Sequence, residues 1–234
     1  GDWSSDVCSS DLGIVAVSSA APLIRLALTW VDPADRVSLS LGLAAARLSV
    51  AAIVLIPSWS GFRHARYSAQ ALRAGGFAGI ALALHFATWI PSLAFTSIAA
   101  STALVTTNPI WVLLIAWFWQ GDRPRQGQIL GIGVALLGGF WVGFGDLQTL
   151  ATVFTGSHPL LGNTLALGGS WAASFYILWG QQAQQQGLSL RHYVALAYTI
   201  AALILLPCLW RSALWHYPAP VYGYMGLLAL FPQL

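Results

Sequence analysis

Lysine and glutamate are absent from the 234-residue sequence, and charged side chains of any kind make up only 7% of it. The ten basic residues are all arginine, the seven acidic residues are all aspartate, and apolar residues account for 57%. An average soluble domain carries about 25% charged residues. A chain so poor in charge would expose apolar side chains to water nearly everywhere. The composition therefore indicates a protein embedded in a lipid bilayer and leaves a soluble helical protein as a remote alternative.

Cysteine is almost as scarce as charge. Cys8 and Cys208 are the only two thiols, and residues so far apart predict neither a disulfide framework nor a cysteine metal site. The apolar stretches hold no histidine-rich metal set, no Ser/His/Asp cluster and no acidic pair, so we expect no enzyme, metal or cofactor. The net charge of +3 does not indicate nucleic-acid binding, because the arginines lie in loops between apolar stretches rather than on one face.

Apolar stretches long enough to cross a bilayer recur along the chain, with short polar breaks between them. We expect the membrane spans to cover residues 13–30, 40–57, 74–93, 98–119, 127–145, 160–180, 192–210 and an incomplete 219–234. Because the connections are short, helices adjacent in sequence should be adjacent in space. The predicted fold is all-α, a polytopic transmembrane helical bundle.

The two ends of the chain differ from the rest. Residues 1–12 (GDWSSDVCSSDL) are polar and hold three of the seven aspartates. They closely resemble the translation of a sequencing adapter, so we expect an artefactual or disordered tail; the alternative is an ordinary polar N-terminus. The last apolar run begins near Pro220 and stops at Leu234, before the roughly 20 residues of a span are complete. We therefore expect a fragment that ends inside its eighth span.

Arginine is unevenly distributed between the predicted loops. Six arginines lie after the second and fourth spans and before the seventh: Arg63, Arg66, Arg73, Arg123, Arg125 and Arg191. The opposite side holds only Arg36 and Arg211. Loops rich in arginine stay in the cytoplasm. The asymmetry predicts a multi-pass protein of the cell (inner or plasma) membrane with a cytoplasmic N-terminus.

A short internal repeat joins the second predicted span to the seventh. Residues 51–57 (AAIVLIP) align with residues 201–207 (AALILLP), and a tryptophan follows each segment, Trp59 and Trp210. The two spans are five helices apart, so the copies would cross the membrane in opposite directions. Inverted repeats are a recurrent transporter architecture, with the binding site at the midplane between the copies.

Residues 94–143 resemble the third-to-fifth helix signature of EamA-domain transporters of the drug/metabolite transporter superfamily. The stretch has a Ser/Ala-rich turn, then Asn108-Pro109, then Gly121-Asp122-Arg123 and a glycine-rich helix. Residues 44–48 (AAARL) are similar to the family's second helix. The sequence departs at Asp122, where the family commonly has glutamate; the resemblance implies a structural role for this carboxylate in packing the loop.

The resemblance extends over residues 13–234 and implies a function as well as a fold. It implies about ten helices in two inverted five-helix repeats, with residues 13–146 as the first repeat and residues 157–234 as the second, truncated in its third span. About seven and a half spans would then be present. The implied function is secondary transport of small organic metabolites by alternating access. The alternative is a membrane receptor or scaffold that does not transport, which needs no special residues.

Arg25 and Arg47 are the only formal charges inside the predicted spans. A charge at a helix centre costs about 2.5–3.5 kcal/mol on insertion scales, so such residues are functional candidates. Each arginine could instead reach the interface or pair with another group for structural reasons. If they face a cavity, they favour a substrate that carries an anionic group, such as a carboxylate.

Five other residues are candidates to line a substrate cavity with these arginines, four of them aromatic. His85 is followed by Trp89 on the same helical face. A buried neutral histidine is the commoner outcome, but proton coupling is the sharper hypothesis, because histidine titrates near neutral pH. Trp171 and Tyr176 lie within the sixth span.

Asn108 is the last cavity candidate, and the remaining predictions concern helix shape and packing. Pro109 removes a backbone donor in mid-span, so Asn108 and Pro109 should mark a kink or a cavity-lining break. Glycines four residues apart predict close helix contacts. The pairs are Gly75 and Gly79, Gly127 and Gly131, and Gly139 and Gly143.

Overall fold

A computed structural model describes residues 18–62, 64–121, 123–149, 158–212 and 216–230. The predictions for residues 1–12 and for Asp122 lie outside these described residues, and so do the contacts of Gly139 and Gly143. Within the described ranges the chain forms helices and no strand. The α-helices are α2 (Ala20–Thr29), α3 (Arg36–Val54), α4 (Ala69–Phe95), α5 (Ile98–Val105), α6 (Asn108–Ile115), α7 (Gln126–Thr149), α8 (Pro159–Gln185), α9 (Leu190–Arg211) and α10 (Ala219–Leu230).

The helices confirm an all-α bundle of the transmembrane kind. Four segments of the described chain are long and apolar enough to cross a membrane: Arg36–Val54, Ala69–Phe95, Ile98–Trp119 and Leu190–Arg211. The helix α8 is as long as α4, 27 residues, but is not among them. Its last turns carry glutamines such as Gln182 and Gln185, which lower its hydropathy.

Serine caps set the starts of three helices. The Ser68, Ser97 and Ser189 hydroxyls accept from the third backbone N–H of α4, α5 and α9. Each satisfies one of the amide donors that a helix leaves unpaired at its N-terminus. The caps therefore fix the residue at which each of these helices begins.

The fourth predicted span is not one continuous helix. It consists of α5, α6 and a π-helical turn, η2 (Ala116–Gln120), with a break at Thr106 and Thr107. Pro109 lies in the first turn of α6, where its missing N–H costs nothing and its fixed φ suits a helix start. The span is interrupted just before Asn108, so Pro109 lies at a helix start rather than inside a kinked helix.

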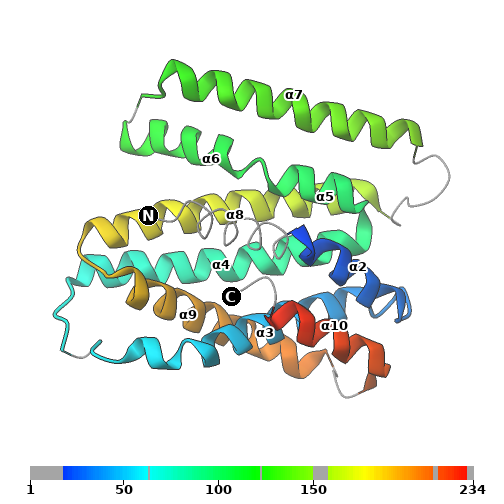
Figure 1. Cartoon of the computed structure of the whole chain (residues 1–234), viewed down its shortest axis with the longest axis horizontal. Coiled ribbons are helices and arrows are strands. Elements are labelled where there is room, and N and C mark those ends of the chain that lie inside the picture. Colours follow the sequence, from blue (N-terminus) through cyan, green and yellow to red (C-terminus); the bar gives the residue numbers. More distant parts are fainter. Residues whose placement is uncertain (1–17, 63, 122, 150–157, 213–215, 231–234) are drawn as a thin grey trace, which may run out of the picture.

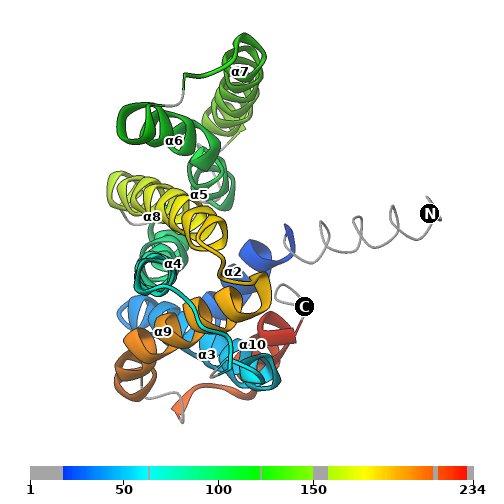
Figure 2. The same cartoon turned by 90° about the vertical axis from the view of Figure 1, so that its left-hand side faces the viewer.

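The helices form a stack in which α4 and α8 are the centre. The helix α4 packs along α8 and against α9, α3 packs against α9, and α10 contacts α2 and α3. Figure 2 shows α3, α9 and α10 on one side of the α4–α8 pair and α5, α6 and α7 on the other. The helix α7 lies at the edge, where α5 is its principal contact.

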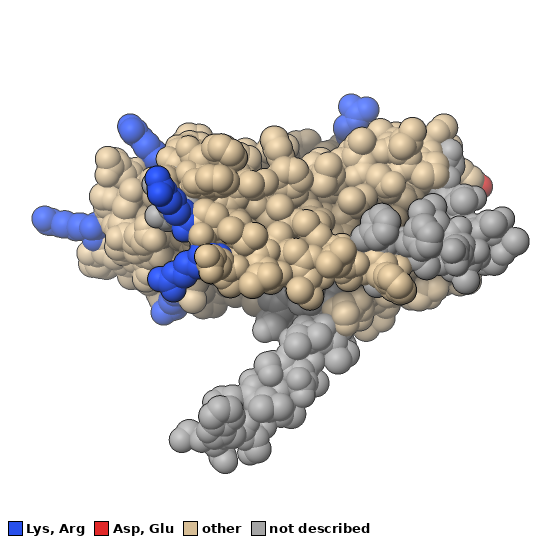
Figure 3. All heavy atoms as spheres, turned by 90° about the horizontal axis from the view of Figure 1, so that it is seen from above, with Lys and Arg blue, Asp and Glu red and all other residues tan. Residues whose placement is uncertain are grey.

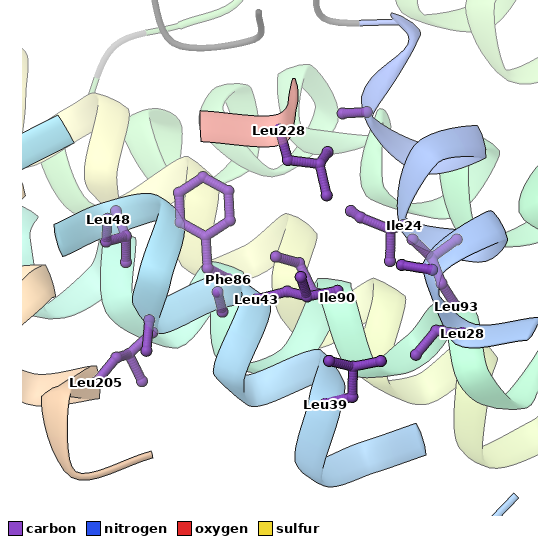
Figure 4. Packing of buried hydrophobic residues seen from close by; sticks show 14 of the residues in the cluster. Ile24, Leu28, Leu39, Leu43, Leu48, Phe86, Ile90, Leu93, Leu205 and Leu228 are labelled. Atoms are coloured by element: carbon purple, nitrogen blue, oxygen red, sulfur yellow. The ribbon is translucent and has the colours of Figure 1, made fainter. Parts of the chain in front are cut away.

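The largest apolar core lies where α2, α3, α4, α9 and α10 meet. Leucine and isoleucine side chains from these helices point toward one another there (Figure 4), including Ile24, Leu28, Leu43, Ile90 and Leu228. A second cluster, made mostly of alanine, joins α4 to α8 and α9. Leucine fills the wide core, and alanine brings the helix backbones close together in the second cluster.

Glycine allows the closest approach between α4 and α9. A Cβ at Gly79 would lie 2.8 Å from the Ile200 Cβ, and one at Gly75 would lie 2.9 Å from the Leu196 Cδ2. The predicted contact of this pair is therefore formed. The contact predicted for Gly127 and Gly131 is not, since a Cβ at either would meet no atom within 4 Å. The reason is that this face of α7 borders open space.

The loops alternate between the two ends of the bundle. The α3–α4, α6–α7 and α8–α9 loops lie at the left-hand end of Figure 1, and the α2–α3, α4–α5 and α9–α10 connections lie at the other. Figure 3 shows the blue arginine atoms gathered mainly at that left-hand end. We call it the arginine-rich end.

Candidate functional site

Arg47 lies at the centre of the bundle. It is about 16 Å of helix rise from Arg36, the start of α3, and is therefore near the middle of a bilayer core. Its side chain is only 6% exposed. The guanidinium carbon lies 5.1 Å from the ring centroid of Phe86 on α4, within cation–π range. His85 packs edge-on against the same Phe86 ring, with centroids 4.9 Å apart, and Tyr198 of α9 packs against the core that contains Phe86.

His85 links α4 to α8. Its Nδ1 lies 2.9 Å from the backbone oxygen of Gly169. Because a carbonyl oxygen can only accept, Nδ1 must carry the hydrogen, and Nε2 is the nitrogen that can gain or lose a proton. The helices approach closely at this point, since a Cβ on Gly169 would lie 3.1 Å from the Trp89 Cβ.

Trp89 lies one helical turn after His85 on α4 and packs against it. Its ring stacks on His85, with centroids 5.6 Å apart and an interplanar angle of 15°. The indole Nε1 is buried and has no hydrogen-bond partner among the residues that the structure describes. A buried N–H without an acceptor is uncommon in native proteins. We call Arg47, His85, Phe86 and Trp89 the central cluster. It brings together a cation on Arg47, a titratable nitrogen on His85 and an N–H donor on Trp89 that has no acceptor among the described residues.

Tyr176 adjoins the central cluster through two tyrosines of α9 that the sequence analysis missed. The Tyr193 ring stacks on Tyr176 at 5.9 Å, and its hydroxyl donates to the Tyr176 backbone oxygen at 3.2 Å. Tyr176 and Tyr198 both pack against the apolar core that contains Phe86. The available signal was that Tyr193 and Tyr198 are the only tyrosines of the predicted seventh span.

Arg25 lies away from the central cluster. Its Nη1 donates to the backbone oxygens of Leu93 and Thr96, at the C-terminal end of α4. The last carbonyls of a helix have no partner inside it and attract a cation. This geometry favours the structural alternative for Arg25 and gives no support to a place in the cavity.

Asn108 and Trp171 lie between α8 and α6, apart from the central cluster. The Asn108 backbone oxygen accepts from Ser174 Oγ at 3.1 Å. Trp171 is 50% exposed and packs edge-on against Trp111 at 5.3 Å. Of the seven cavity residues predicted from sequence, the structure thus brings together Arg47, His85 and Trp89, with Tyr176 beside them.

Two buried serines of α8 fix the break between α5 and α6. Ser170 Oγ lies 3.1 Å from Thr107 Oγ1, and Ser174 donates to Asn108 as described above. The Trp111 Nε1 also donates to Thr107 Oγ1. These serines were not predicted from the sequence, although their spacing of one helical turn places them on one face of α8.

Comparison with known proteins identifies a family. The model of the EamA-like transporter family matches residues 12–144, more than half of the chain. Among curated proteins, none matches the sequence. The matched range contains Arg47, His85, Phe86 and Trp89.

Proposed function

Because the chain belongs to the EamA-like transporter family, we propose that it is a secondary transporter that moves a small organic metabolite across the cell membrane by alternating access. The family match over residues 12–144 carries this proposal. The charge-poor helical bundle supports it, since such a surface suits lipid. The interrupted α5–α6 helix also supports it, because broken helices recur at transporter binding sites.

The central cluster is our proposed substrate site, and an anionic group is the feature we expect it to bind. The Arg47 guanidinium would attract a carboxylate or phosphate, and the Trp89 N–H would donate to the same group. The cluster is largely buried, with Arg47 6% exposed, so a solute would reach it only after the surrounding helices separate. Proton coupling through His85 Nε2 belongs to the same proposal.

Helix pairing supports two inverted repeats, residues 13–146 and 157–234. An inverted repeat would exchange α2 with α8, α3 with α9 and α4 with α10. Under that exchange the α4–α8 contact corresponds to α10–α2, and the α4–α9 contact corresponds to α10–α3. The α3–α9 contact corresponds to itself. These contacts are present, as expected if a two-fold axis passes between α3 and α9, whereas the α3–α4 contact has no comparable counterpart between the described parts of α9 and α10.

The test is flux of labelled organic anions into proteoliposomes that contain the full chain. We expect uptake that saturates and that falls at least tenfold in Arg47→Gln. Arg73→Gln is the matched control, because Arg73 is exposed at the arginine-rich end. It should transport normally. Folded protein without flux of any tested solute would favour a receptor or scaffold, and normal flux in Arg47→Gln would remove Arg47 from the site.

A further inference from the structure

A crevice of about 840 Å³ opens between α6 and α7, on the side of α8 remote from α3 and α9. Its walls are mainly apolar and include Val112, Leu113, Ile132 and Ala135. Its volume lies in the upper part of the range for ligand pockets, about 300–1,000 Å³. Gly131 lines it, and a Cβ there would meet no atom within 4 Å. The crevice is therefore open along α7.

One end of the crevice is basic. Arg123 and Arg125 line it at the arginine-rich end, together with Gln128. Both arginines are exposed, and Arg125 is hydrogen-bonded to Gln128 through its backbone N–H and C=O groups. From this mouth the apolar walls continue to Asn108, about 12 Å along α6. That depth is close to one leaflet, half of the roughly 30 Å hydrocarbon core.

The surroundings of the crevice decide what kind of molecule fits it. Large apolar side chains of α7, Leu130, Val134 and Leu137, are exposed beside it and would face lipid in a membrane. A water-soluble anion would match the arginines but not the apolar walls. A phospholipid with an anionic headgroup matches both, with its phosphate at the arginines and an acyl chain between the helices.

We propose that this crevice binds an anionic phospholipid of the leaflet at the arginine-rich end. Arg123 and Arg125 hold the headgroup, and the face of α7 at Gly131 accommodates an acyl chain beside Val112 and Leu113. The site lies apart from the central cluster and does not depend on which solute the protein transports. The bound lipid fills the space that separates α7 from α6.

Photo-crosslinking tests the proposal directly. The full chain is reconstituted into vesicles of equal parts phosphatidylglycerol and phosphatidylcholine, with a trace of either lipid carrying a diazirine in its acyl chain. We expect phosphatidylglycerol to crosslink preferentially to residues 108–116 and 131–135. Arg123→Gln/Arg125→Gln should reduce this preference over phosphatidylcholine about tenfold. Arg73→Gln, which removes a charge at the same end but outside the crevice, should leave it unchanged.

A second variant separates binding in the crevice from attraction to a charged surface. Gly131→Leu fills the apolar part and keeps both arginines, so crosslinking at residues 108–116 should fall for both lipids. If Gly131→Leu does not fold, Ala135→Leu serves the same purpose. Crosslinks spread evenly over the lipid-facing helices, equal labelling by the two lipids, or an equal loss in Arg73→Gln would each overturn the proposal.

Discussion

The guanidinium of Arg25 reaches from α2 to the end of α4, where it donates to the backbone oxygens of Leu93 and Thr96. Hydrogen bonds to a charged donor contribute about 1.5–3 kcal/mol each when their loss leaves a partner unsatisfied. Arg25→Gln should therefore lower the free energy of unfolding by about 1–3 kcal/mol, and Arg25→Lys by less, because lysine keeps the charge.

Unfolding in detergent with increasing dodecyl sulfate, followed by tryptophan fluorescence, measures this effect. Arg73→Gln is again the control, since it removes an exposed arginine and should change stability by no more than about 0.5 kcal/mol. An Arg25→Gln variant that is as stable as the control, but transports poorly, would return Arg25 to the substrate cavity.

His85 offers a separate prediction about coupling. In His85→Asn the side-chain amide can still donate to the Gly169 oxygen, as Nδ1 does at 2.9 Å, but no nitrogen titrates. We expect the variant to fold, because the α4–α8 hydrogen bond is kept. Uptake that varies between pH 5 and 8 in the parent should become flat in the variant. Unchanged pH dependence in His85→Asn would assign coupling to another group.

At the scale of single residues, sequence predicted which side chains are unusual but not what they touch. Arg25 and Arg47 are functional candidates for the same reason, because each places a charge inside a predicted span. Only the structure separates them, because Arg25 meets the free carbonyls of α4 while Arg47 lies over the Phe86 ring. The difference depends on helix–helix register, which no local pattern in either span encodes.

Among the helices, the contact of α4 with α9 is sensitive to a single methyl group. A Cβ on Gly79 would lie 2.9 Å from the backbone oxygen of Ala197, so α9 must move to admit it. Overpacking of this kind typically costs about 1–3 kcal/mol. Gly79→Ala should destabilise the protein by that amount in the same unfolding assay.

Gly76 is the matched control on the same helix. A Cβ there would lie 3.8 Å from Ile200 Cδ1, an ordinary contact, and alanine is the better helix former. Gly76→Ala should be neutral or slightly stabilising. Equal effects of the two substitutions would show that helix propensity, rather than the α4–α9 contact, decides the outcome.

Sequence patterns predicted each helix and the break in the fourth span, because apolar length and proline act locally. They did not predict how the break is held. Ser170 and Ser174 of α8 bond to Thr107 and Asn108, more than 60 residues earlier in the chain. The four-residue glycine spacing predicted close contacts at both Gly79 and Gly131, and the structure forms only the one at Gly79, since the spacing does not say which helix faces meet.

At the scale of the whole molecule, the structure places together the loops that the order of the predicted spans assigns to one end. The orientation of that end in the membrane is a prediction. The six arginines of the α3–α4, α6–α7 and α8–α9 segments should hold the arginine-rich end in the cytoplasm. Two exposed positions report the two ends, Ala34 in the α2–α3 loop and His64 in the α3–α4 loop.

Labelling with a membrane-impermeant maleimide reads the orientation directly. In a Cys8→Ser/Cys208→Ser background, Ala34→Cys should react in intact cells, and His64→Cys should react only in inverted vesicles. The cysteine-free background controls for other reactions. The opposite pattern would place the N-terminus outside. It would also move the basic mouth of the α6–α7 crevice to the outer leaflet, so this measurement fixes which leaflet supplies the proposed lipid.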